Sequence, residues 1–162
     1  MEYIDFLKTK IELAIDSGFT VERDAINKAL KPHQADAVAW ALKGGRRALF
    51  ESFGLGKTVQ EIEFCHLAAV HEGGKALIVL PLGVKQEFTQ DAVNILGYER
   101  PKYVRTMQEV KEAKEQILLT NYERVRDGDI DPSYFAATSL DEASVLRSFG
   151  SKTYQTFLDK FK

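Results

Sequence analysis

From residue 47 onward, segments with the hydrophobic pattern of a strand alternate with segments that have the pattern of a helix. Apolar runs typical of strands occur at 47–51, 75–80, 102–106, 116–120 and 136–140. Between these runs, apolar residues recur every three or four positions, which predicts helices at 57–71, 84–96, 107–114 and 151–161. Residues 76–80 are apolar throughout, as expected for a strand that is buried on both faces. This alternation predicts an α/β fold with a mostly parallel sheet.

The N-terminal part of the chain shows helical patterns only. Apolar residues between 3 and 17 fall on one helical stripe that ends at Gly18, and a second short helix is expected over 24–30. A third helix is expected to begin at Pro32 and to stop before two consecutive glycines. We therefore expect a helical accessory segment over 1–30, followed by one main domain over 31–162.

Composition narrows the class of protein. The 162 residues include 44% hydrophobic and 28% charged residues, which is the balance of a globular domain. The net charge of −2 disfavours a basic protein that coats DNA, although a local basic groove is compatible with it. Cys65 is the only cysteine, so no internal disulfide is expected, and a buried apolar position suits it. No apolar run approaches the ~18 residues of a membrane span, and we expect a cytoplasmic protein.

The stretch 51–58 reads Glu-Ser-Phe-Gly-Leu-Gly-Lys-Thr and lies between a predicted strand and a predicted helix. A glycine-rich turn at a helix N-terminus directs backbone N–H groups and positive potential at one point, which suits a phosphate chain. Lys57 would reach the β- and γ-phosphates, and the Thr58 hydroxyl would bind Mg²⁺. The candidate nucleotide-binding residues of this loop are Phe53, Gly54, Leu55, Gly56, Lys57 and Thr58.

The strict P-loop pattern has a glycine where this chain has Glu51. The alternative is therefore a glycine-rich turn that only joins a strand to a helix.

A pair of acids, Asp141 and Glu142, follows the predicted strand at 136–140. Ligands gather at the carboxyl ends of strands in open α/β sheets. Asp141 would help to hold Mg²⁺ through water, and Glu142 would polarise the attacking water. The alternative is a solvated acidic pair that opens a helix, where its charge favours the helix dipole.

Three motifs resemble those of superfamily 2 helicases and come in the same order. They are 30–34 (Leu-Lys-Pro-His-Gln), 54–58 (Gly-Leu-Gly-Lys-Thr) and 140–144 (Leu-Asp-Glu-Ala-Ser). Residues 144–154 are similar to the segment after the acidic motif in Snf-type DNA translocases, and 120–123 are similar to their Thr-x-Tyr-Glu motif. The chain most resembles phage and bacterial Snf-like helicases, over residues 30–158.

This resemblance implies a three-layer, RecA-like P-loop NTPase fold that binds ATP and Mg²⁺. Gln34 is similar to the glutamine that reads adenine, because an amide can donate and accept hydrogen bonds at once. Taken alone, Gln34 favours an exposed polar helix position, and the neighbouring motifs reverse this preference. The residues that would grip a nucleic-acid backbone without reading its sequence are Pro81, Leu82, Gly83, Thr120, Asn121 and Tyr122. For Tyr122, the alternative is a core tyrosine at the end of a strand.

Two departures from the family pattern affect the implied function. Ser144 stands where better-known groups have an aspartate or a histidine that couples hydrolysis to domain motion. No motif of the Thr-Ala-Thr-Pro kind follows the acidic pair, and no second RecA-like domain follows it either. The second domain supplies arginine fingers in the family, and these are worth on the order of 10³–10⁵ in rate.

The resemblance thus implies the N-terminal RecA-like domain of an ATP-dependent DNA helicase or translocase, an incomplete motor core with little activity by itself. Its expected partners are ATP, DNA and a second RecA-like domain, in the cytoplasm of a bacterium or a phage-infected host. A nucleotide-binding decoy or regulatory module without motor activity is the first alternative. A P-loop enzyme of another class, such as a small-molecule kinase, is the second, and the paired acids disfavour it. The sequence leaves open whether the track is DNA or RNA.

Overall fold

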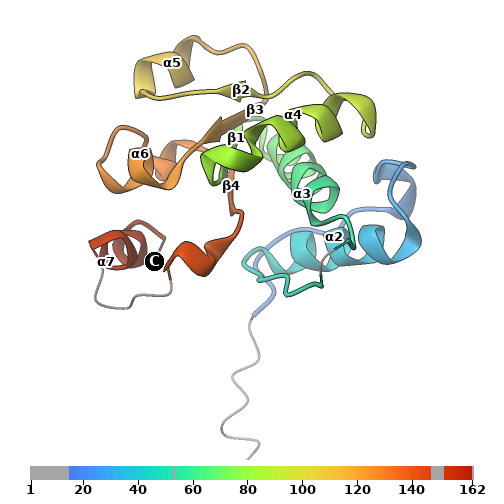
Figure 1. The fold of residues 1–162 in the computed structure, drawn as a ribbon. Coiled ribbons are helices and arrows are strands. Elements are labelled where there is room, and N and C mark those ends of the chain that lie inside the picture. Colours follow the sequence, from blue (N-terminus) through green and yellow to red (C-terminus); the bar gives the residue numbers. More distant parts are fainter. Residues whose placement is uncertain (1–14, 53, 147–151, 162) are drawn as a thin grey trace, which may run out of the picture.

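A four-stranded, all-parallel sheet forms the centre of the protein (Figure 1). The structure, a computed structural model, describes residues 15–52, 54–146 and 152–161. The strands are β1 (Ala76–Val79), β2 (Lys102–Tyr103), β3 (Ile117–Thr120) and β4 (Ala137–Leu140), in the order β2-β3-β1-β4. Val79 lies opposite both Thr120 and Leu140, so the carboxyl ends of the three longer strands meet at one edge of the sheet.

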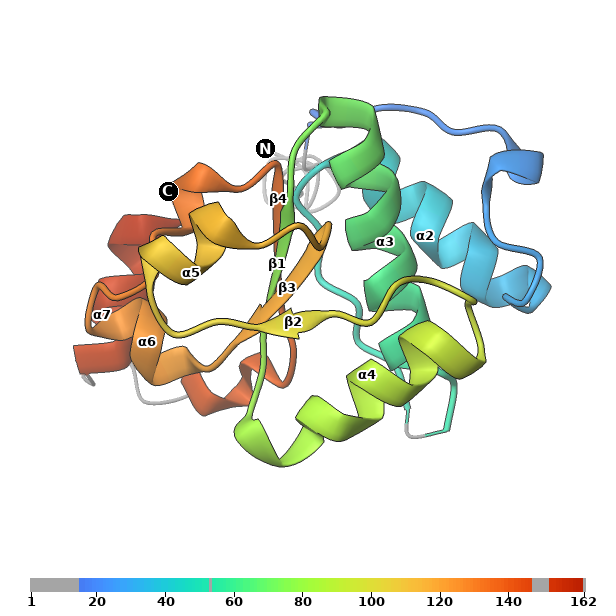
Figure 2. The same cartoon turned by 90° about the horizontal axis from the view of Figure 1, so that it is seen from above.

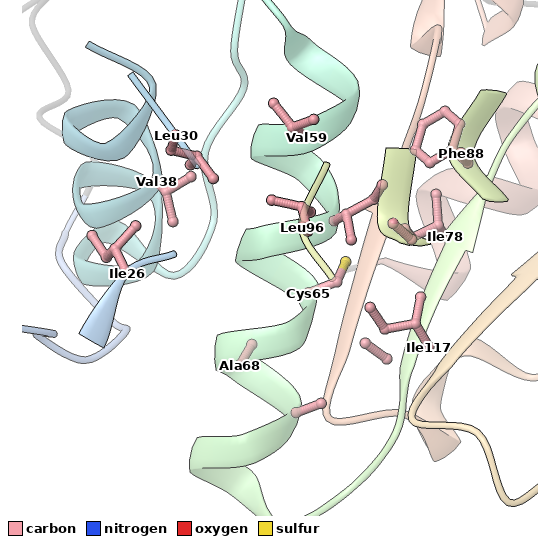
Figure 3. Close-up of a cluster of buried hydrophobic side chains, with 14 of the residues drawn as sticks. Ile26, Leu30, Val38, Val59, Cys65, Ala68, Ile78, Phe88, Leu96 and Ile117 are labelled. Carbon is pink, nitrogen blue, oxygen red and sulfur yellow. The ribbon is translucent and has the colours of Figure 1, made fainter. Parts of the chain in front are cut away.

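One face of the sheet is covered by α3 (Lys57–Glu72) and α4 (Lys85–Asn94), and α2 (Pro32–Gly44) packs against α3. In β1 and β3, alternate residues point to this face, as the period of a strand requires. Figure 3 shows α3 in the middle of this core, with Cys65 on the side that faces Ile78 and Ile117. Cys65 is fully buried, as its apolar neighbours in the sequence indicate.

The opposite face of the sheet carries α5 (Met107–Glu112), α6 (Tyr122–Arg126) and α7 (Lys152–Lys160), as Figure 2 shows from above. Leu77, Val79 and Leu118 of the sheet pack there against buried residues such as Val110 and Phe157. Helices on both faces of a parallel sheet confirm the predicted three-layer α/β class. Within the described residues, no helix is both long and apolar enough to cross a membrane.

The remaining regular segments are short 3₁₀ helices, at Arg23–Ala25, Leu82–Val84, Pro132–Tyr134 and Ala143–Leu146. The helix expected at 24–30 is thus reduced to a single turn. The helix expected at 3–17 falls mostly outside the described residues, and 15–17 are not helical. Instead, the backbone N–H groups of Ser17, Gly18 and Phe19 donate to carbonyls of the last turn of α2. These carbonyls have no partner within the helix, so the extended segment caps it.

The strand predicted at 47–51 is wrong. These residues form no strand, and the Phe50 side chain is 95% exposed. The polar groups of this segment are bound elsewhere: Arg47 pairs with Asp16 at 2.7 Å, and both the backbone and the side chain of Glu51 accept hydrogen bonds from α3. Within the described residues, β4 therefore pairs only with β1.

Candidate functional site

The glycine-rich loop leads directly into the N-terminus of α3. Gly54 and Gly56 have φ of 80° and 76°, in the left-handed region that favours glycine. A Cβ at Gly56 would lie 2.3 Å from the Nε2 atom of Gln34, so this position has no room for a side chain. Because the first N–H groups of α3 have no partners within the helix, the helix start offers donors of the kind that suit an anion. Phe53 lies outside the described residues.

Gln34 of α2 holds this loop through its side-chain amide. Its Nε2 donates to the Leu55 carbonyl at 2.8 Å, and its Oε1 accepts from the Lys31 backbone N–H at 2.8 Å. The residue is 7% exposed, so the alternative of an exposed polar position is excluded. Both halves of the amide are thus engaged within the chain, and an adenine edge would have to exchange with these partners.

Lys57 and Thr58, the first two residues of α3, make different contacts. The Nζ atom of Lys57 lies 3.4 Å from the Glu51 carbonyl oxygen and donates to it. The Thr58 hydroxyl donates to the Oε1 atom of Glu87 at 3.2 Å. Glu87 belongs to the first turn of α4, so the start of this helix lies beside the start of α3.

The acidic pair lies where β4 ends, as predicted. The N–H of Asp141 donates to the Val79 carbonyl at 2.8 Å, and the Asp141 carbonyl accepts from the Tyr122 hydroxyl at 2.6 Å. These two bonds fix the Asp141 backbone from both sides. Glu142 has φ 51° and is the one non-glycine residue with positive φ in the part of the chain described. Such a conformation costs on the order of 1–3 kcal/mol, and it is often found at functional sites.

Electrostatics place the loop and the acidic pair in one site. Desolvation is the main cause that raises the pKa of Asp141 above its usual value; the negative charges of Glu142 and Glu87 also raise it, and the Lys57 charge lowers it. Charges influence a pKa in this way only when they lie close together. Hydrogen bonds from Thr58 to Glu87 and from Ser139 to Glu61 agree with this, so the starts of α3 and α4 lie near the carboxyl end of β4.

Glu61 is a member of this site that the sequence prediction missed. It lies one turn after Lys57 on α3, and its Oε1 accepts from the Ser139 hydroxyl of β4 at 2.6 Å. Burial is the main cause that raises the pKa of Glu61 to about 8, and the negative charge of Asp141 raises it further. The hydrogen bond from Ser139 and the positive charge of Lys57 lower this pKa. The four-residue spacing from Lys57 places both side chains on one helix face, and this signal was available in the sequence.

The two segments predicted to grip nucleic acid meet at a pocket of about 310 Å³. The pocket is lined by Leu80, Pro81, Leu82, Tyr122, Glu123, Arg126 and Thr153. Leu82 is 55% exposed, and a Cβ at Gly83 would meet open space. Arg126 and Thr153 were not among the predicted residues, because only folding brings α6 and α7 to the end of β1.

The second predicted segment is engaged within the protein. The Thr120 hydroxyl donates to the Val104 carbonyl at 2.9 Å, and the Asn121 Oδ1 accepts from the Tyr103 hydroxyl at 2.8 Å. Tyr122 is 6% exposed and packs against Phe157, with 5.4 Å between the ring centres. Its ring belongs to the core, which agrees with the alternative stated for it.

We compared the chain with known families, curated proteins and solved structures. Neither a protein-family profile nor a curated protein matches the sequence. The Sulfolobus solfataricus SWI2/SNF2 ATPase core in complex with dsDNA matches with a TM-score of 0.64 at 20% identity, over 85% of this chain and 31% of that one. The UvsW helicase from bacteriophage T4 matches with a TM-score of 0.66 at 18% identity, over 99% of this chain and 56% of that one.

A second T4 UvsW structure matches with a TM-score of 0.63 at 18% identity, over 97% of this chain and 32% of that one. The chain therefore shares its fold with these solved ATPase and helicase structures. It spans between 31% and 56% of the length of these solved chains.

The site formed by the 54–58 loop and the acidic pair has oxygen ligands of the kind that Mg²⁺ prefers. These are too few to surround the metal with protein ligands alone. In the ranges that the structure describes, no three His, Cys, Asp or Glu side chains form a metal-binding group. Mg²⁺ in nucleotide sites is usually held by one or two protein oxygens together with phosphate oxygens and water. The hydroxyl of Thr58 and the carboxylate of Asp141 fit that pattern.

Proposed function

We propose that this chain is the ATP-binding, RecA-like part of a DNA helicase or translocase of the Snf-like, superfamily 2 type. The observation that carries the proposal is the convergence of Lys57, Thr58 and Asp141 at the carboxyl edge of the sheet. If the glycine-rich turn only joined two elements, there would be no functional reason for an acidic pair to lie close enough to influence its charges. The fold supports the assignment, since it is shared with a SWI2/SNF2 ATPase core and with a helicase.

The residues divide the work of phosphoryl transfer among them. Bound ATP supplies the phosphoanhydride and Mg²⁺ supplies positive charge at its oxygens. The N–H groups of the 54–56 loop and the Lys57 ammonium hold the phosphates, while Thr58 and Asp141 hold the metal. Glu142 orients water, and Gln34 contacts adenine after exchanging its present partners.

The raised pKa of Asp141 has a consequence for metal binding. A carboxylate must lose its proton to bind Mg²⁺, so a raised pKa makes metal binding release a proton. The apparent affinity for Mg²⁺ therefore increases with pH until Asp141 is fully ionised. The Tyr122 hydroxyl holds the Asp141 backbone in place throughout, because it binds the carbonyl and not the carboxylate.

DNA is proposed to pass over the edge formed by Pro81, Leu82 and Gly83. Gly83 and the exposed Leu82 present backbone groups there, and the pocket beside them includes Arg126 and Thr153. Contacts of this kind bind phosphates without reading bases, which suits a protein that moves along any sequence. The SWI2/SNF2 structure of the same fold is a complex with dsDNA, which favours DNA as the track.

The Lys57→Ala variant tests the nucleotide site. Because a hydrogen bond to a charged group is worth roughly 1.5–3 kcal/mol, we expect its affinity for a fluorescent ATP analogue to fall at least about tenfold. A titration with Mg²⁺ present measures this. Lys111→Ala is the matched control, since Lys111 is an exposed lysine on α5, across the sheet, and should bind as the wild type does. Wild-type affinity in Lys57→Ala would refute the proposal.

A further inference from the structure

The Thr58 hydroxyl has a carboxylate partner on a neighbouring helix, and no sequence motif predicted this contact. We propose that Glu87 is a positioning residue that orients the Thr58 hydroxyl for Mg²⁺. The inference rests on the proposed function, because it assigns a role within the same nucleotide site. In the structure, the Thr58 Oγ1 atom donates to the Glu87 Oε1 atom at 3.2 Å.

The chemistry of a hydroxyl explains why the direction of this bond matters. A threonine hydroxyl has one hydrogen to donate and two lone pairs that can accept a hydrogen bond or bind a metal. When the hydrogen points at Glu87, both lone pairs remain available for a cation. A threonine without this acceptor could turn its hydrogen toward the metal position, and each metal-binding event would then have to reorient it.

The position of Glu87 is fixed by the core below it. The next residue, Phe88, is 1% exposed and belongs to the hydrophobic core between α3 and the sheet. The turn Leu82–Val84 runs directly into α4, and the Val84 N–H donates to the Pro81 carbonyl at 3.1 Å. Glu87 thus lies on one continuous unit with the Pro81–Gly83 edge. Its backbone is held although its side chain is exposed.

Glu87 is assigned a positioning role because its side chain accepts the hydrogen bond of the Thr58 hydroxyl. The Glu87 charge is felt at Asp141, where it contributes to the raised pKa of that carboxyl group. An outer partner that orients a ligand commonly changes metal affinity by about 10–100-fold.

The experiment measures the Mg²⁺ concentration that gives half-maximal binding of a fluorescent ATP analogue. It compares four 162-residue proteins: the wild type, Glu87→Ala, Glu87→Gln and Glu99→Ala. Glutamine keeps an oxygen that accepts from Thr58, whereas alanine removes it. Glu99→Ala removes one exposed carboxylate from the loop after α4, so it controls for the loss of charge. Thermal unfolding of each variant confirms that it is folded.

We expect Glu87→Ala to need about tenfold more Mg²⁺, and the other two variants to stay within about twofold of the wild type. Nucleotide binding without Mg²⁺ should be the same in all four proteins. If all four need equal Mg²⁺, Glu87 has no positioning role, while the proposed function stands. If Glu87→Ala needs less Mg²⁺, Glu87 competes with the metal and the inference is wrong. If the wild type does not bind the nucleotide, the proposed function itself fails.

Discussion

At the scale of single residues, the acids around Lys57 raise a question of charge balance. Glu51, Glu61, Glu87 and Asp141 all contact or influence the start of α3, and ionising all of them would make the site strongly negative. Glu61 resolves part of this conflict, because burial raises its pKa to about 8. At neutral pH it is mostly protonated, and so it adds little negative charge. The sequence alone does not show this, since an acidic residue in a helical pattern gives no sign that its side chain is buried.

Glu61 should make the stability of the protein depend on pH. Its ordinary pKa of 4.5 rises to about 8 in the folded state. Between these values the folded protein keeps a proton that the unfolded chain has lost, so the free energy of unfolding falls as pH rises. The slope is at most ~1.4 kcal/mol per pH unit. Glu61→Gln lacks this titration, and its stability relative to the wild type should therefore increase from pH 5 to pH 8.

Urea unfolding at pH 5, 6, 7 and 8 measures this difference. Asp141 contributes a slope of the same sign, but it is present in both proteins and largely cancels in the comparison. Glu99→Gln, which changes an exposed glutamate, should follow the wild-type curve. Parallel curves for Glu61→Gln and the wild type would show that Glu61 titrates normally.

At the scale of elements, α6 and α7 support the acidic pair from the far side of the sheet. Phe157 of α7 is 3% exposed and packs against the ring of Tyr122, the first residue of α6. The hydroxyl of that tyrosine reaches the Asp141 carbonyl, so ring packing and a hydrogen bond act through one side chain. The end of β4 is therefore held by the α-helices that come before and after it in the chain.

Tyr122→Phe separates these two contributions, because it keeps the ring and removes the hydroxyl. We expect it to lower the free energy of unfolding by about 1 kcal/mol, the usual net value of one hydrogen bond. Phe157→Ala should cost about 3–5 kcal/mol, because it empties a buried aromatic position. Denaturant titration measures both, with Tyr134→Phe as a control at a half-exposed tyrosine, where little change is expected. If the Tyr122→Phe protein is as stable as the wild type, the hydrogen bond from Tyr122 to the Asp141 carbonyl does not stabilise the fold.

At the scale of the whole molecule, the chain corresponds to part of the solved structures that share its fold. It spans 31% of the SWI2/SNF2 chain and 56% of one UvsW chain. We propose in addition that a second RecA-like domain closes the site at the 54–58 loop and supplies an arginine finger.

We therefore expect the 162-residue chain to bind ATP but to hydrolyse it slowly and to displace no strand from duplex DNA. Without an arginine finger, turnover should be about 10³–10⁵-fold below that of a complete motor. Phosphate release with and without DNA tests this, and Lys57→Ala gives the background rate. Strand displacement by this chain alone would contradict it. If joining a second RecA-like domain restores no DNA-stimulated hydrolysis, a decoy or regulatory module is the better interpretation.

The sequence by itself determined the class of fold and the two chemical motifs. Periodicity predicted α2, α3, α4, α5, α7 and all four strands, because burial on one or two faces leaves a direct record in the order of apolar residues. The loop at 54–58 and the pair at 141–142 were recognisable because phosphate binding restricts residue types locally. Their roles in binding and catalysis stay predictions.

Tertiary structure alone decided the contacts that join distant segments. Residues 47–51 have the apolar pattern of a strand, but their polar groups bind Asp16 and α3, which no local pattern encodes. The partnerships of Thr58 with Glu87, Glu61 with Ser139 and Tyr122 with Asp141 likewise depend on the packing of separate elements. Hydrogen bonds and desolvation act over a few ångströms in space, whereas sequence patterns record only neighbours along the chain.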